Sequence, residues 1–348
     1  MRTVDSERAS RISVAWRRCM AGVSLLAGLV VLAPAGANDS TASLDAGGLR
    51  LTSNADIRME SEDLYISRAE VRVVYRFRNT SARDISTLVA FPLAPMQMDE
   101  GSNYELHGSD PVNVMDFQVT VDGRRVEPSV EVKAMRFGVD VTDVLRRHGI
   151  PPTMRTQSQD SHEALWNRLT NMPADARSEL ERYDLIDWNT RFGADGKPWA
   201  NVHWDTYITF YWFQTFPAGR TIEVTHRYRP VPRQFFFVAE ELGSAERQKA
   251  YCLDADFQRA VRARLQAGPQ NVMLGFELKY VLKTAGNWLG PIQRFRLTVE
   301  KSKADSLVSL CAKGLRRVSP TAFVVSRENY SPEDDLRILF LEPAEASK

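Results

Sequence analysis

Short runs in which apolar and polar residues alternate recur through much of the chain. In the clearest one, VRVVYRFRN at residues 71–79, valine and aromatic side chains share one side, and Arg72, Arg76 and Arg78 share the other. A period of two is typical of antiparallel strands that bury one face. The pattern therefore predicts a mainly β fold: an antiparallel β-sandwich, either single or as two sandwiches in tandem.

Helical periodicity replaces this alternation in two places. We interpret residues 138–190 as a helical insertion between strands, and we expect one further helix that ends before Gly268. The expected helices cover about residues 140–148, 161–170, 174–183 and 255–266. The chain then divides into an N-terminal β-sandwich with this insertion, residues 38–235, and a C-terminal α+β or β-sandwich part, residues 236–348, with a boundary near residue 235.

The first 37 residues have the pattern of a cleaved signal peptide. Several arginines precede an uncharged run at residues 20–33, and Ala35 and Ala37 are the small residues expected at a cleavage site. The run is shorter than the roughly 18 to 20 apolar residues that span a bilayer, although a membrane anchor is the alternative. We expect a mature chain from Asn38, periplasmic or secreted, without a transmembrane segment after cleavage.

The charge balance limits the partners. The chain carries 45 Lys and Arg against 44 Asp and Glu, a net charge of +1. Residues 1–37 hold five of the cations and two of the carboxylates, so the mature chain has 40 against 42, or −2. A near-neutral protein lacks the long-range field that attracts nucleic acid, so we expect no nucleic-acid partner. The arginines of residues 71–79 are either the solvated face of a sheet or a site for an anionic envelope polymer.

Two cysteines, Cys252 and Cys311, remain after cleavage. A pair of cysteines in an exported chain usually closes into a disulfide, and we expect that bond here. The alternative is that Cys252 is an activated thiolate nucleophile.

Four stretches of the sequence resemble a known family. They are MESEDLYIS at residues 59–67, VRVVYRFRNTSARDISTLVAFPL at 71–93, TFPAGRTIEVTHRYRP at 215–230 and YCLD at 251–254. Together they resemble the exported bacterial family called domain of unknown function 4424, over the chain from Asn38 onward. This resemblance implies no particular reaction, ligand or catalytic residue. Residues 70–135 and 215–230 also look like the vault and inter-alpha-trypsin inhibitor type of β-sandwich, which implies an adhesive or scaffolding module.

The sequence contains few motifs that indicate chemistry. On an extended strand Glu60 and Glu62 would point the same way, but neighbours on one strand project in parallel and do not flank a substrate. Glu105 and His107 share a face without a third metal ligand. We therefore expect no catalytic residue, metal or cofactor.

An aromatic segment, WANVHWDTYITFYWFQTF at residues 199–216, is the most informative stretch. Rings crowd both faces of this expected strand, so it must be covered twice, and core packing accounts for most of them. The functional alternative is a groove for a glycan or peptide. The candidate binding residues are Trp199, His203, Trp204, Asp205, Tyr207 and Tyr211.

These features favour an exported cell-envelope protein that acts as a non-catalytic binding or scaffolding module. The expected partner is an envelope protein or a glycan. The alternative is an envelope hydrolase that acts on a glycan or peptide, with residues 199–216 and the helical insertion forming its cleft.

Overall fold

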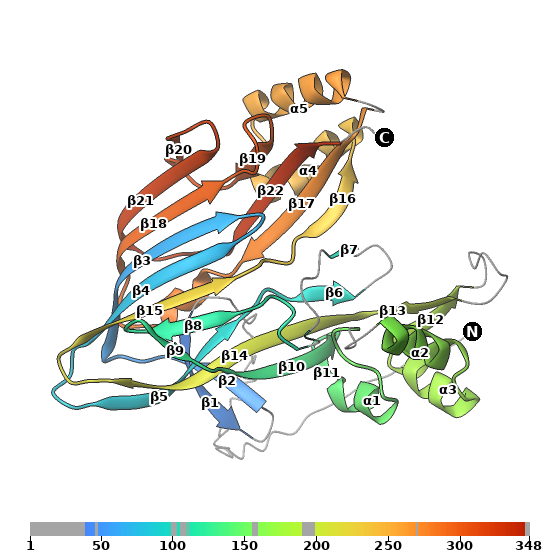
Figure 1. Cartoon of the computed structure of the whole chain (residues 1–348), viewed down its shortest axis with the longest axis horizontal. Helices are drawn as coiled ribbons and strands as arrows, with labels where there is room; N and C mark the ends of the chain where they lie inside the picture. Colours follow the sequence, from blue (N-terminus) through green and yellow to red (C-terminus); the bar gives the residue numbers. More distant parts are fainter. Residues whose placement is uncertain are drawn as a thin grey trace, which may run out of the picture. The chain divides into compact units, whose positions relative to one another are not determined.

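The alternating runs form the strands of three sheets in the computed structural model (Figure 1). The structure describes residues 39–45, 48–98, 103–104, 110, 112–154, 159–189, 199–268 and 271–344. These residues belong to one compact unit, Ala35–Lys348. The predicted signal peptide and the candidates Glu105 and His107 lie outside the described residues, and the boundary expected near residue 235 stays a prediction.

The eight-stranded sheet has the order β20-β21-β18-β3-β4-β15-β8-β9. Its strands are β3 (Ile57–Ser67), β4 (Val71–Asn79), β8 (Gln118–Val121), β9 (Arg124–Val126), β15 (Thr221–Tyr228), β18 (Ile292–Glu300), β20 (Arg316–Arg317) and β21 (Ala322–Tyr330). Its pairs are antiparallel except β3 with β18, which run parallel.

The seven-stranded sheet has the order β11-β10-β14-β5-β1-β2, with β6 also paired to β14. Its strands are β1 (Ser40–Asp45), β2 (Gly48–Thr52), β5 (Ile85–Pro92), β6 (Met96–Met98), β10 (Ser129–Arg136), β11 (Val139–Asp140) and β14 (Trp204–Phe216). Pro92 ends β5, as expected of a residue that has no N–H for the ladder.

The five-stranded sheet has the order β19-β22-β17-β16-β7. Its strands are β7 (Asn103–Tyr104), β16 (Arg233–Phe237), β17 (Met273–Tyr280), β19 (Leu307–Leu310) and β22 (Leu336–Pro343). A separate hairpin pairs β12 (Ile186–Asn189) with β13 (Trp199–Val202).

Strand β4 follows the predicted alternation. Its valines, Tyr75 and Phe77 are buried, whereas Arg72, Arg76 and Arg78 are exposed. The buried side of the eight-stranded sheet packs against both other sheets. The ring of Phe77 packs edge-on against that of Phe216 in the seven-stranded sheet, and the Tyr75 hydroxyl lies 3.0 Å from that of Tyr280 in the five-stranded sheet. Hydrophobic burial between sheets therefore places the rings and arginines of β4, and the predicted mainly β, sandwich-like fold is confirmed.

The predicted helices are also present. They are α1 (Thr142–Arg147), α2 (Gln159–Thr170), α3 (Ala174–Arg182) and α5 (Ala255–Ala267). The helical insertion ends in strand β12, which its sequence did not reveal. Helix α4 (Ala245–Tyr251) and the 3₁₀ turns η1 (Ala239–Gly243) and η3 (Lys283–Asn287) were also missed, because short polar segments carry little periodicity. No helix in the described ranges is long and apolar enough to cross a membrane.

The polar connection after β4 is held by Asn79, a fully buried side chain. Its Nδ2 donates to the carbonyl oxygens of Arg83 and Phe216, at 2.7 and 2.8 Å. Its Oδ1 accepts from the backbone N–H and the hydroxyl of Ser81. One amide thus fixes the turn between β4 and β5 and ties it to the end of β14.

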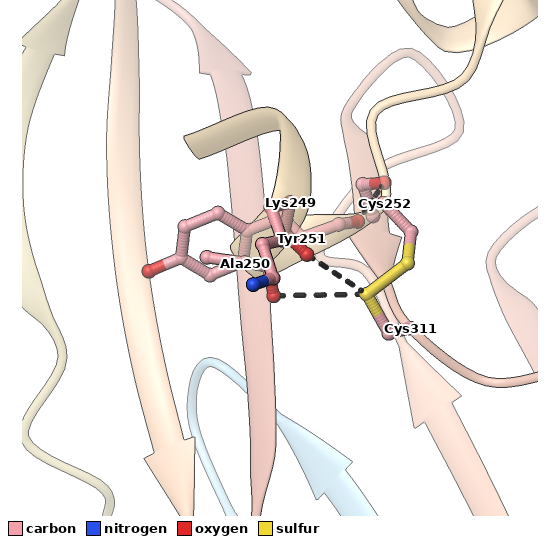
Figure 2. The surroundings of a disulfide bond; sticks show 6 residues. Lys249, Ala250, Tyr251, Cys252 and Cys311 are labelled. Carbon is pink, nitrogen blue, oxygen red and sulfur yellow. Dashed lines mark hydrogen bonds between the residues drawn. A yellow bond between two sulfur atoms is a disulfide. The ribbon is translucent and has the colours of Figure 1, made fainter. Parts of the chain in front are cut away.

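The predicted disulfide is confirmed: Cys252 and Cys311 are bonded across 59 residues (Figure 2). Cys252 caps the C-terminus of α4 in the left-handed conformation, with φ of 52°, and Cys311 directly follows β19. The Cys311 sulfur lies 3.4 Å from the carbonyl oxygen of Lys249. A disulfide sulfur has no proton to donate, so this is a packing contact that holds the end of α4 against the five-stranded sheet.

Candidate functional site

The residues predicted to bind a ligand divide between two sides of β14. Trp204 is buried, and its Nε1 donates to the carbonyl oxygen of Pro152 at 2.7 Å. Asp205, Tyr207 and Tyr211 alternate with it and are half-buried on the other side. Burial, together with the charge of Asp205, raises the pKa of Tyr207.

Two candidates belong to the hairpin region. His203 directly precedes β14, and its Nε2 lies 3.0 Å from Oδ2 of Asp187 on β12. Trp199 begins β13, and its side chain lies outside the described residues. The structure thus brings Asp205, Tyr207 and Tyr211 to one side of β14 and uses Trp204 in the core. A ligand site made by these six residues stays a prediction.

The expectation that Glu60 and Glu62 point the same way is wrong. A register shift between Met59 and Ser61 inserts a β-bulge into β3. Glu60 accepts a hydrogen bond from Thr221, whereas Glu62 turns into the core and is 1% exposed. A bulge reverses the alternation beyond it, and no local signal in the sequence marked this one.

Glu62 belongs to a buried polar cluster that sequence reasoning missed. Asp39 and His226 are fully buried, and His226 Nε2 lies 3.5 Å from Asp39 Oδ1. Burial and the charge of Glu62 raise the pKa of Asp39, and burial lowers the pKa of His226 to about 3. Burial therefore favours the uncharged form of each group.

Aromatic rings surround His226 and explain this lowered pKa. The rings of Phe91, Phe117, Tyr75 and Trp212 have centroids 4.7 to 5.4 Å from its own. These side chains exclude water and so disfavour an imidazolium. The cluster is part of the core, since Asp39, Glu62 and His226 are all buried.

A cavity of about 410 Å³ is the better candidate site. Its walls come from the segment after β5, the end of β15, helix α4 and strands β17 and β22. The lining residues are Leu93, Ala94, Pro95, Met96, Gln97, Tyr104, Met115, Tyr228, Pro230, Val231, Arg233, Ser244, Glu246, Arg247, Ala250, Tyr251, Glu277, Leu278, Lys279 and Arg337. The volume falls within the range of about 300 to 1,000 Å³ that is typical of small-molecule sites.

Glu277 organises the charged wall of the cavity. Its Oε1 accepts from Arg247 Nη1 at 2.5 Å, and its Oε2 lies 3.7 Å from Arg233 Nη1. Burial raises the pKa of Tyr251, and the charge of Glu277 and a hydrogen bond to it add to this effect. A carboxylate that accepts from Arg247 and Tyr251 and forms an ion pair with Arg233 is suited to fix a wall rather than to transfer protons.

Arg247 is itself held in place on several sides. Its Nε lies 3.0 Å from Oε2 of Glu241, and its guanidinium stacks over Phe235 at 4.6 Å from the ring centroid. Ser244 caps α4 by accepting from the backbone N–H of Arg247. The disulfide anchors the other end of the helix beside Tyr251 (Figure 2). The wall is therefore rigid before a ligand arrives.

Apolar side chains line another part of the cavity. The buried side chains are Leu93, Met96, Met115 and Val231. Tyr228 adds an aromatic ring, and burial raises the pKa of its hydroxyl. Four cations and two carboxylates line the charged part. An apolar wall with a few fixed polar groups is the usual composition of a ligand pocket.

Sequence reasoning missed this cavity because its charged residues come from positions 233, 246, 247, 277, 279 and 337. The pairing of β17 with β16 and with β22, together with the docking of α4, brings them together. The one usable signal was Tyr251, the neighbour of a predicted half-cystine. Within the part of the chain that the structure describes, no three His, Cys, Asp or Glu residues are grouped to hold a metal ion.

The fold and the disulfide define a mainly β protein with a lined cavity on its five-stranded sheet. The model of the family described as "Domain of unknown function (DUF4424)" matches residues 37–339. The chain therefore belongs to this family, and the resemblance seen in its sequence is confirmed. The likeness to the vault type of sandwich stays a prediction.

The chain also has similarity to a solved structure. It is the crystal structure of a "putative nutrient binding protein" from Legionella pneumophila subsp. pneumophila str. Philadelphia 1. The two are 15% identical, with a TM-score of 0.43, over 88% of this chain and 70% of the other. No curated protein matches the sequence.

Proposed function

We propose that this protein is an exported, non-catalytic binding protein of the cell envelope, and that its ligand site is the cavity between α4, β17 and the segment after β5. The observation that carries the proposal is the preorganised wall. Arg247, Tyr251 and Arg233 converge on Glu277 beside an apolar surface.

The cavity suits binding better than hydrolysis. Of its two carboxylates, Glu277 accepts hydrogen bonds from Arg247 and Tyr251 and forms an ion pair with Arg233, and Glu246 is exposed on the first turn of α4. A hydrolase needs a base with a free lone pair within reach of water or a nucleophile. The lining residues instead supply shape, apolar contact and fixed charge.

Two features support export. The disulfide between Cys252 and Cys311 is of the kind that persists outside the cytosol. The pattern of residues 1–37 is that of a signal peptide. Cell fractionation followed by N-terminal sequencing tests this part. We expect a mature chain that begins at Asn38 outside the cytoplasm, and a full-length chain in the cytosol would contradict it.

A pair of substitutions on α4 tests the site. Ala250 lines the cavity, and Ala245 is an exposed residue of the same helix that does not. Ala250→Phe should fill part of the cavity, whereas Ala245→Phe adds the same bulk outside it. The mature protein is incubated with a small-molecule extract of the envelope, and retained compounds are identified by mass spectrometry.

We expect the wild type and Ala245→Phe to retain the same compound and Ala250→Phe to lose it. Equal retention by all three proteins, or no retention by the wild type, would refute a ligand site in this cavity. A circular-dichroism melt of each variant separates lost binding from lost folding.

A further inference from the structure

Two neighbouring cations line one end of the cavity. Lys279 on β17 is the direct cross-strand partner of Arg337 on β22, and both side chains are exposed. Both line the same cavity. Like charges placed directly opposite each other destabilise a sheet, so this pair has a cost that the fold alone does not explain.

No carboxylate in the described ranges forms an ion pair with either cation. Glu277 lies two residues before Lys279, about 7 Å along the same face of the strand, but it is engaged by Arg247 and Arg233. The other acidic lining residue is Glu246 on α4. Asp335, close to Arg337 in sequence, instead accepts from the backbone N–H groups of Leu282 and Lys283.

Lys279 and Arg337 therefore line the cavity without an ion-pair partner among the described residues. Arg247 is fixed to Glu277 and Glu241, and the positive charge of Arg337 acts on the hydroxyl of Tyr251. A compact oxyanion placed between Lys279 and Arg337 would neutralise the repulsion between them. It would leave the remainder of a ligand beside the apolar wall at Met96 and Val231.

We propose that Lys279 and Arg337 form an oxyanion subsite, so that the ligand of this cavity is a small organic anion with an apolar body. The inference rests on the proposed function, since it names the ligand class of that same cavity. The oxyanion is a carboxylate or a phosphate, and the two are distinguished by experiment.

Three probes with one apolar body test the subsite: 2-naphthoate, 2-naphthyl phosphate and the neutral 2-naphthylmethanol. Binding to the mature protein is measured by isothermal titration calorimetry at low and high salt. We expect one or both anions to bind about tenfold more tightly than the alcohol, with an advantage that salt reduces. The anion that binds more tightly shows whether the subsite prefers a carboxylate or a phosphate.

Substitutions of the two cations test whether the tighter binding of the anions depends on Lys279 and Arg337. Lys279→Gln and Arg337→Gln should each remove most of that tenfold advantage. Lys283→Gln is the matched control, because Lys283 lies on η3, pairs with Asp334 at 3.9 Å and does not line the cavity. Lys279→Gln should also raise the melting temperature of the free protein, because it removes a like-charge pair. A purely structural lysine would lower it.

Equal binding of the alcohol and the anions, or no binding of any probe, overturns the subsite. Retention of the anion advantage in both glutamine variants overturns it as well. The proposed function is decided separately, by the loss of the retained compound in Ala250→Phe. The two failures are therefore distinguishable.

Discussion

Buried His226 should make the stability of this protein depend on pH in a way that one substitution removes. Burial lowers its pKa to about 3 in the folded protein, against 6.5 for an ordinary histidine. Between these values the unfolded chain binds a proton that the folded chain does not. The unfolding free energy therefore falls as the pH falls below about 6.5, and the contribution is exhausted near pH 3.

The magnitude follows from the difference between the two pKa values. Each pKa unit corresponds to about 1.4 kcal/mol, so the full contribution is about 5 kcal/mol. From pH 7.5 to pH 4.5 about 3 kcal/mol of it should be lost. His226→Phe keeps a ring among Phe91, Phe117 and Trp212 and cannot titrate. The unfolding free energy of this variant should therefore not fall by this amount.

The groups that face His226 must be considered with it. Asp39 lies 3.5 Å away, and Glu62 and Tyr75 belong to the same cluster. The raised pKa of Asp39 has the opposite sign: its contribution is complete below about pH 4 and is lost as the pH rises through the raised value. The two effects partly cancel in the wild type, so the single variants are needed.

The assay is urea unfolding followed by tryptophan fluorescence, with the disulfide intact, from pH 4.5 to pH 7.5. The difference in unfolding free energy between His226→Phe and the wild type should grow in favour of the variant as the pH falls. Asp39→Asn provides the test of opposite sign. Parallel curves for the wild type and His226→Phe would refute the conclusion that His226 is neutral in the folded protein.

Three further variants test individual contacts, and a fourth, Phe213→Ser, is a control. Cys252→Ser with Cys311→Ser should lower the unfolding free energy by about 4 kcal/mol on the chain-entropy model, and an unchanged urea midpoint would show that the bond does not restrict the unfolded chain. Asn79→Ala removes an amide that is hydrogen-bonded to Arg83, Phe216 and Ser81, so it should cost about 2 to 4 kcal/mol in the same assay, and a cost below 1 kcal/mol would contradict its role in the turn. Trp204→Phe removes one of the two donors to the carbonyl of Pro152, which keeps that of the Thr206 hydroxyl, and it also reduces the volume of a buried side chain, so it should cost about 1 to 3 kcal/mol. Phe213→Ser, on the same strand at 81% exposure, should change stability by less than about 0.5 kcal/mol.

Much of the β architecture could be predicted from the sequence, because a strand that buries one face shows a local alternation of apolar and polar residues. The strand at Val71–Asn79 alternates in sequence, and its buried and exposed sides follow that alternation. The helices near residues 161–170 and 255–266 were visible for the same reason. The disulfide was predictable because two cysteines in an exported chain have one possible partner each.

The exceptions are places where a local rule was overridden. The bulge at Met59 and Ser61 turned Glu62 into the core, and nothing near it in sequence marks the extra residue. Helix α4 is too short to show a period, although its cap at Ser244 is regular. Neither the bulge nor helix α4 can therefore be identified from the local sequence alone.

The alternation, the disulfide and the family could be predicted because each depends on residue types at fixed spacing. Which charges meet depends on how the sheets pair and pack. Lys279 and Arg337 are separated by 58 positions and become neighbours because β17 pairs with β22 in one register. Charge interactions act through space and not along the chain, so the cavity and the proposed oxyanion subsite could be recognised only from the packing of the sheets.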